Sequence, residues 1–152
     1  MSELKARNVM SKEVLVVEKG TLVKEVAKLF TEKKIGGAPV VDENGKLVGI
    51  VTEGDLIMQD VRIHFPTYIH LLDGFIFLQS FGRFERELKK AVGARAEDVM
   101  TPDVVTVSED TPLEEIATLM VEKDVSRLPV LRGDKIVGMV TKGDIVRAIA
   151  RD

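Results

Sequence analysis

The heptapeptide Gly-Ile-Val-Thr-Glu-Gly-Asp at residues 49–55 returns as Gly-Met-Val-Thr-Lys-Gly-Asp at residues 138–144. Around it, the whole stretch from Val9 to Asp55 recurs, with one deletion, as the stretch from Val99 to Asp144. Two such similar stretches are expected to adopt one fold. Because a unit of about 50 residues is marginal alone, the copies are predicted to pack around a pseudo-twofold axis with related clefts between them.

Each copy is predicted to run strand, helix, strand, strand, helix, a mixed α/β fold of the α+β type. The first strands are the β-branched runs Val14–Val17 and Val104–Val107. A stripe of apolar residues then predicts a helix in each copy: Leu22, Val26, Leu29 and Phe30, repeated as Leu113, Ile116, Ala117, Leu119 and Met120. In the second copy Thr111 as N-cap, Pro112 at the first helical position and Glu114 at the third predict a capping box.

A hairpin follows in each copy. Residues 38–41 and 46–51 are predicted to pair across the turn 42–45. In the second copy, 128–131 and 135–140 pair across a shorter turn. A last helix is predicted after each Asp, from Asp144 to Ala150 in the second copy, with Ile145, Val146 and Ile149 on its apolar face.

The expected organisation is therefore one copy at residues 1–57, a segment at 58–94 that does not repeat, and a second copy at 95–152. The middle segment holds both histidines, His64 and His70, and most of the aromatic residues. It is too apolar for a solvated loop, so it is expected to cover a core edge, a ligand or another subunit. The spacing of the two histidines is not a zinc pattern.

Composition excludes several function classes. The formal charge of -3 and the pI near 5.5 give no general attraction to polyanions. The absence of cysteine excludes disulfide scaffolds and thiol nucleophiles. Residues 1–5 lack the apolar core of a signal peptide and the longest apolar region is too short to span a bilayer, so a cytoplasmic protein is expected.

The chemistry is concentrated where each strand ends in Thr-x-Gly-Asp. Thr52 with Asp55, and Thr141 with Asp144, have the spacing of an N-cap and its N3 partner, so one interpretation is helix capping alone. The other is ligand binding: Gly54 in a first helical turn suits close approach to backbone N–H groups. A carboxylate beside such groups can accept hydrogen bonds from both hydroxyls of a ribose.

The whole pattern resembles the cystathionine-β-synthase-type (CBS) domain. It combines Val-Met before a strand, an amphipathic helix, Arg-Leu-Pro-Val at residues 127–130, and Gly-x-Val-Thr-x-Gly-Asp. Two copies in tandem resemble the CBS pair, or Bateman module. This resemblance covers both copies and leaves out the middle segment, here residues 58–94.

The resemblance implies regulatory binding of an adenosine compound (AMP, ADP, ATP or S-adenosylmethionine) in clefts between the copies, with signalling by conformational change. Thr52 and Asp55 would hold the ribose in one cleft, and Thr141 and Asp144 in the other. Arg127 matches a family position that often binds phosphate, whereas the first copy has Gly37 there, so the clefts should differ in phosphate affinity. Backbone groups would face the adenine, those of Met10, Leu15 and Ile35 over Asp144 and those of Met100, Val105 and Val125 over Asp55.

The resulting expectation is a non-enzymatic ligand sensor that forms a homodimer, acts on an unknown regulated partner and requires no cofactor. An enzyme is disfavoured because no nucleophile and base stand at a recognisable spacing. A structural dimerisation module with empty clefts and a single-stranded nucleic-acid binder stay open as alternatives. The sequence leaves open which adenosine compound binds and whether Mg²⁺ accompanies a phosphate.

Overall fold

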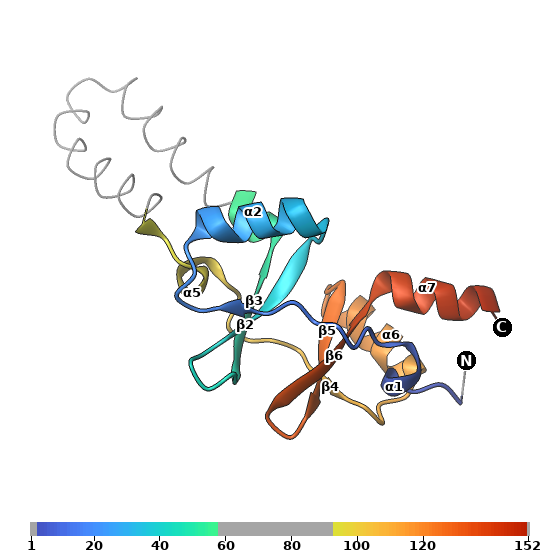
Figure 1. Ribbon diagram of the computed structural model, residues 1–152. Coiled ribbons are helices and arrows are strands. Elements are labelled where there is room, and N and C mark those ends of the chain that lie inside the picture. Colours follow the sequence, from blue (N-terminus) through green and yellow to red (C-terminus); the bar gives the residue numbers. More distant parts are fainter. Residues whose placement is uncertain (1–2, 58–92, 152) are drawn as a thin grey trace.

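The computed structural model describes residues 3–57 and 93–151, which form two similar units lying side by side (Figure 1). The predicted His64, His70 and aromatic segment falls outside the described residues, apart from positions 93 and 94. The first copy of the repeat contains α1 (Ala6–Val9), β1 (Val17–Glu18), α2 (Val23–Lys33), β2 (Gly37–Val41) and β3 (Leu47–Thr52), after which residues 53–57 are helical. The second contains α5 (Ala96–Val99), β4 (Val107–Ser108), α6 (Leu113–Glu122), β5 (Arg127–Arg132), β6 (Lys135–Thr141) and α7 (Lys142–Arg151).

The predicted order of strand, helix, strand, strand and helix is confirmed in both copies. Each sheet has three strands, in the orders β1-β2-β3 and β4-β5-β6. The first pair in each sheet is parallel and the second is the predicted antiparallel hairpin. In the first hairpin turn the backbone N–H of Lys46 donates to Asp42 Oδ1 at 2.9 Å, which lowers the pKa of that carboxyl.

The predicted first strands are too long. Only Val17 and Glu18 pair with β2, and only Val107 and Ser108 pair with β5. The residues before them, 14–16 and 104–106, lie outside the strands although they are β-branched or apolar. Four of these residues, at positions 14, 15, 104 and 105, instead line cavities between the two copies.

The short helices at the start of each copy are exchanged between the units. Figure 1 shows the N-terminal segment with α1 beside the second unit, while α5 lies beside the first. Ala6 of α1 is fully buried in the core formed by the second copy, and Ala96 of α5 is fully buried in the core of the first. The two copies are therefore interlocked: each folded unit contains the short first helix of the other copy.

The exchanged segments also accept hydrogen bonds from the first N–H groups of the long helices in the units that they join. The N–H of Leu113 at the start of α6 donates to the carbonyl of Leu4 at 2.9 Å, and the N–H of Val23 in α2 donates to that of Ala94 at 2.9 Å. The capping box predicted at Thr111, Pro112 and Glu114 is consequently wrong. The helix begins one residue later, at Leu113, and the Thr111 hydroxyl instead accepts a hydrogen bond from the N–H of Ser108 at 3.0 Å.

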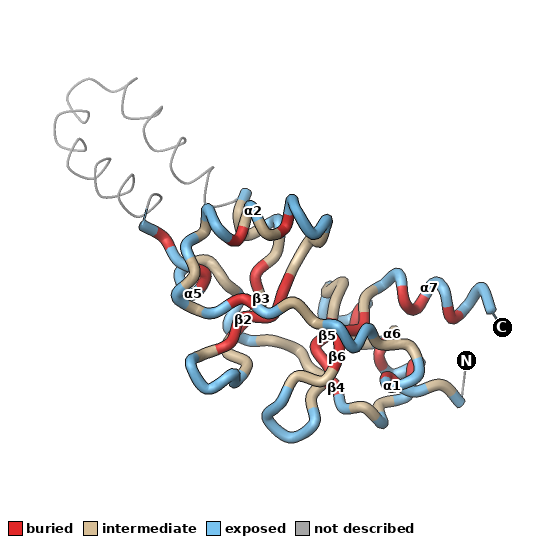
Figure 2. Tube along the Cα trace, viewed as in Figure 1, coloured by how far each residue is buried: buried red, intermediate tan, exposed pale blue. Residues whose placement is uncertain are grey.

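Buried residues gather where the helices face the sheets (Figure 2). One core surrounds Leu113, Ile116 and Leu128, and the other surrounds Val26 and Val40. The predicted apolar face of the last helix is correct only in part. Ile145 is buried, but Val146 and Ile149 are 64% and 57% exposed, because α7 turns Asp144, Ile145 and Ala148 inward.

Candidate functional site

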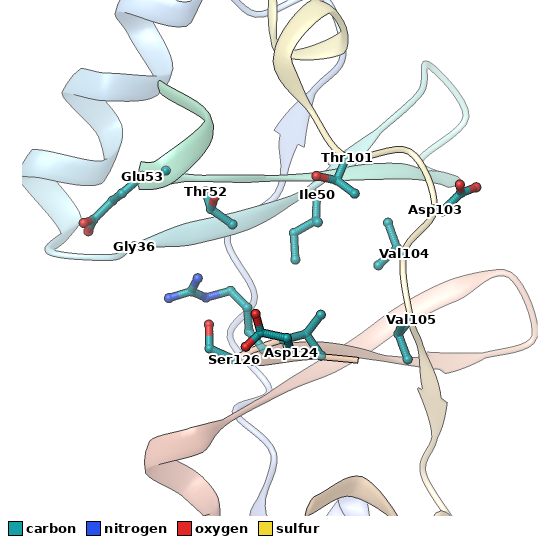
Figure 3. Close-up of a pocket in the computed structure, with 13 residues that line it drawn as sticks. Gly36, Ile50, Thr52, Glu53, Thr101, Asp103, Val104, Val105, Asp124 and Ser126 are labelled. Atoms are coloured by element: carbon teal, nitrogen blue, oxygen red, sulfur yellow. The ribbon is translucent and has the colours of Figure 1, made fainter. Parts of the chain in front are cut away.

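A cavity of about 480 Å³ lies between the two copies (Figure 3). It is called here the Thr52 cavity. Thr52, Glu53 and Gly54 line it from the end of β3, and the second copy contributes two segments, 103–105 and 124–127. In Figure 3 Thr52 and Glu53 lie on the side of the first copy, Asp124 and Ser126 lie opposite, and Asp103 is at the far end from Glu53. A strand end from one copy thus faces two loops from the other.

A related cavity of about 270 Å³, called the Thr141 cavity, repeats this arrangement with the copies exchanged. Thr141 at the end of β6 faces two segments of the first copy, residues 13–15 and 35–37. Ser11, Pro39, Arg127 and Met139 complete its lining. The two cavities are the pair of related clefts that a repeated sequence with a pseudo-twofold arrangement predicts.

The residues expected to face an adenine divide into two groups. Val105 and Val125 line the Thr52 cavity, and Leu15 and Ile35 line the Thr141 cavity. Met10 and Met100 line neither. They pack against the two cores, Met10 with its side chain against Gly138 and Met100 against Gly49. The side chains of Met10 and Met100 therefore hold the exchanged segments, which contain α1 and α5, in place beside the cavities.

Each aspartate accepts the same two hydrogen bonds from the threonine three residues before it. Asp55 Oδ2 accepts from the N–H of Thr52 at 2.8 Å and from its hydroxyl at 3.1 Å. Asp144 Oδ2 accepts from the N–H of Thr141 at 2.8 Å and from its hydroxyl at 3.2 Å. This is the geometry of helix capping, and in each case it uses only one of the two carboxylate oxygens. A carboxylate has about four acceptor positions, so capping and ribose binding are compatible.

The surroundings of the two aspartates nevertheless differ. Asp144 is only 8% exposed, and its Oδ1 accepts a hydrogen bond from Arg147 Nη2 in an ion pair. Asp55 is half-buried, and the residue aligned with Arg147 in the first copy is the uncharged Met58. Asp144 is thus accompanied by a guanidinium that the sequence supplies in one copy alone. Neither Asp55 nor Asp144 lines a cavity itself; each lies three residues after the threonine that does.

Arg127 lies between the two cavities and lines both. It passes over Gly36 and Gly37: a methyl group added at Gly37 would lie 2.8 Å from Arg127 Cδ, and one added at Gly36 would lie 3.0 Å from its Nη2. The glycine pair of the first copy makes room for the arginine of the second. One guanidinium can therefore reach either cavity, which differs from the expectation that Arg127 distinguishes them.

Sequence reasoning did not single out four charged or polar lining residues. Glu53, Asp103, Asp124 and Ser126 all line the Thr52 cavity. Asp124 ends the α6 turn with a left-handed φ of 51°, as Lys34 does at the end of α2 with a φ of 55°. The repeat alignment contained the signal, because these positions flank the segments expected to face the adenine. Within the described ranges 3–57 and 93–151, no group of three metal-ligating side chains is present.

Comparison with known proteins identifies the family. The family model described as CBS domain matches residues 6–61 and 96–151. The chain is 32% identical to the uncharacterized protein MJ1426 of Methanocaldococcus jannaschii, over 94% of this chain and 89% of that protein. It is 36% identical to the chloroplastic CBS domain-containing protein CBSX2 of Arabidopsis thaliana over 88% of this chain, but spans only 57% of that relative.

Solved structures are similar over nearly the whole chain. The crystal structure of CBSX2 in complex with AMP superposes with a TM-score of 0.76 at 31% identity, covering 97% of this chain and 96% of that one. The CBS domain pair of protein MJ0100, in complex with 5′-methylthioadenosine and S-adenosyl-L-methionine, gives a TM-score of 0.71 at 26% identity and covers 97% of both chains. Two family matches in one chain, with these likenesses, leave one assignment: the protein belongs to the CBS domain family and contains two CBS domains in tandem.

Proposed function

We propose that this CBS pair is a non-enzymatic sensor that binds adenosine-containing compounds in the Thr52 and Thr141 cavities and signals by changing shape or partner affinity. The observation that carries the proposal is the composition of the two cavities. Each combines the threonine at a strand end of one copy, Thr52 or Thr141, with apolar loop residues from the other copy. An apolar slot with a few convergent polar groups suits a nucleoside. The AMP complex of CBSX2 and the adenosine ligands of MJ0100 support this choice of ligand class.

In this proposal Asp55 and Asp144 accept hydrogen bonds from the ribose hydroxyls. Replacing either with Ala is expected to weaken binding in its own cavity about ten- to hundredfold, because a hydrogen bond to a charged acceptor contributes roughly 1.5–3 kcal/mol. Isothermal titration calorimetry with AMP and with S-adenosylmethionine measures the loss.

The matched control is Asp98→Ala. Asp98 makes the same capping contact, accepting from the N–H of Arg95 at 2.8 Å, but lies in α5 and not next to Thr52 or Thr141, the threonines that line the cavities. The Asp98→Ala variant should be less stable than the unaltered protein but should bind AMP and S-adenosylmethionine with the same affinity. If Asp55→Ala, Asp144→Ala and the double variant bind as tightly as the unaltered protein, the aspartates only cap helices. If no adenosine compound binds at all, the sensor function is wrong, and the protein is a structural module or a nucleic-acid binder.

Arg127 is expected to bind phosphate. Its replacement by Ala should weaken AMP about tenfold or more while adenosine binding changes little, since a guanidinium recognises phosphate through charged hydrogen bonds that a nucleoside cannot make. Arg132→Ala is the control, because Arg132 is exposed and pairs with Glu109 away from both cavities. Equal losses for adenosine and AMP would contradict the assignment. A separate titration with ATP, in the presence and in the absence of Mg²⁺, tests whether the ion assists binding.

We also propose a homodimer. Three exposed apolar side chains support it: Val146 and Ile149 on α7, and Ile57, which aligns with Val146 and is 62% exposed. Exposed apolar side chains at related helical positions are typical of a twofold interface. The double variant Val146→Lys/Ile149→Lys should be monomeric by light scattering at tens of micromolar, with Glu115→Lys on α6 as a dimeric control. A monomeric unaltered protein would refute the dimer.

A further inference from the structure

The two cavities have related shapes but different charges. The Thr52 cavity is lined by three carboxylates, Glu53, Asp103 and Asp124, and by one cationic side chain, Arg127. Among the charged residues that line the Thr141 cavity are one carboxylate, Glu13, and the same Arg127. The shared arginine is therefore outnumbered by carboxylates on one side and balanced by one on the other.

The repeat alignment shows where this difference originates. Glu53 in the first copy corresponds to Lys142 in the second, and Asp124 in the second corresponds to Lys34 in the first. Asp103 and Glu13, which also correspond, have the same sign. The charge is thus inverted at two of three related positions, and at both of them the carboxylate lines the Thr52 cavity whereas the corresponding lysine lines neither cavity.

The backbone at these positions is the same in the two copies, so the inversion is a difference of side chain alone. The N–H of Glu53 donates to the carbonyl of Gly36 at 3.0 Å, and that of Lys142 donates to the carbonyl of Ser126 at 3.0 Å. Lys34 and Asp124 both have left-handed φ angles, of 55° and 51°. Glu53 and Lys142 can consequently be exchanged for each other without a change of fold, and so can Lys34 and Asp124.

We infer that the two cavities divide adenosine ligands by charge. The Thr141 cavity takes the compound that carries a phosphate, and the Thr52 cavity takes an adenosine compound whose 5′ substituent has no negative charge. Glu53 and Asp124 are the residues that exclude phosphate from the Thr52 cavity. This inference rests on the proposed function, since it assigns ligands to the same two cavities.

The physical reason is Coulombic. Like charges about 7 Å apart repel even in water, and a nearly dianionic phosphate doubles the effect of each carboxylate. Exposed charges are partly screened by salt, so each carboxylate contributes a modest factor. Converting two carboxylates to lysines changes four units of charge, for which we expect a combined effect on AMP affinity of about tenfold or more at low salt.

The first experiment locates AMP and 5′-methylthioadenosine by calorimetry in Asp55→Ala and Asp144→Ala. AMP binding should be weakened about ten- to hundredfold in Asp144→Ala and unchanged in Asp55→Ala. In protein saturated with AMP, 5′-methylthioadenosine should still bind, and this second binding should be weakened by a similar factor in Asp55→Ala. AMP that prefers the Thr52 cavity, or that fills both cavities equally, would overturn the inference.

Charge exchange provides a second test that does not require changing a buried aspartate. The double variant Glu53→Lys/Asp124→Lys should gain an AMP site, with at least about tenfold tighter AMP binding in the Thr52 cavity. Glu25→Lys/Glu115→Lys is the matched control, because it makes the same change in net charge at exposed sites on α2 and α6 that line neither cavity.

The outcomes separate this inference from the function on which it rests. If AMP and 5′-methylthioadenosine both fail to bind the unaltered protein, the proposed function is wrong and the division of ligands falls with it. If both bind but Glu53→Lys/Asp124→Lys and the control change AMP affinity equally, only the role of Glu53 and Asp124 is overturned.

Discussion

Removing residues 2–11 is expected to unfold the second copy while the first copy stays folded. The deleted segment contains α1, whose Ala6 is fully buried in the second core, and it also supplies Leu4, Val9 and Met10 to that core. It makes backbone hydrogen bonds there as well: the N–H of Ala6 donates to the carbonyl of Thr111 at 2.9 Å, and Ser11 and Met139 pair in both directions.

The size of the effect follows from what the segment buries. Each apolar side chain removed from a core contributes roughly 1–3 kcal/mol, so the deletion is on the order of the whole stability of a small domain. Amide hydrogen exchange measures the result by residue. Protection should be lost at Leu128, Val130 and Val140 and retained at Val40 and Val51, which belong to the first core.

A crossed pair of point variants is the control. Ala6→Asp should reduce protection in the second core, and Ala96→Asp should reduce it in the first, because each alanine is fully buried in the core of the other copy. Loss of protection in the first core on deleting residues 2–11, with the second core unchanged, would contradict the exchange.

This exchange marks the boundary of what the sequence could predict. The repeat, both hairpins and the final helix are encoded locally, by turn residues such as Asp42 and Gly45 and by apolar periodicity, and each is confirmed. The start of α6 is different. Its first N–H is satisfied by the carbonyl of Leu4, more than a hundred positions away, so a local rule placed the cap on Thr111 instead.

The same distinction applies to the cavities. Thr52 and Thr141 could be found from sequence because the Thr-x-Gly-Asp motif is contiguous and occurs twice. The shared position of Arg127 could not, since it depends on the second copy meeting Gly36 and Gly37 of the first across the pseudo-twofold axis. Side chains that act between copies become visible only when the copies are placed together.

Gly49→Ala is expected to destabilise the protein strongly, by about 1–3 kcal/mol or more, through overpacking. Gly49 is buried in β3 opposite Val40, and Met100 of the exchanged segment that contains α5 lies directly over it. A methyl group there would lie 2.8 Å from Met100 Cγ and 3.0 Å from the carbonyl oxygen of Thr101. That carbonyl cannot move away freely, because it accepts a hydrogen bond from the N–H of Ile50 at 2.9 Å.

Two comparisons make this prediction specific. Gly138→Ala in the second copy should have a smaller effect, because the three nearest atoms all belong to the flexible side chain of Met10 and none to the backbone. Gly20→Ala should be neutral or slightly stabilising, since Gly20 has open space around its Cα and does not require a positive φ. Chemical denaturation of the three variants gives their order of stability. If Gly49→Ala unfolds at the same denaturant concentration as Gly20→Ala, the close packing of Met100 and Thr101 on β3 does not contribute to stability.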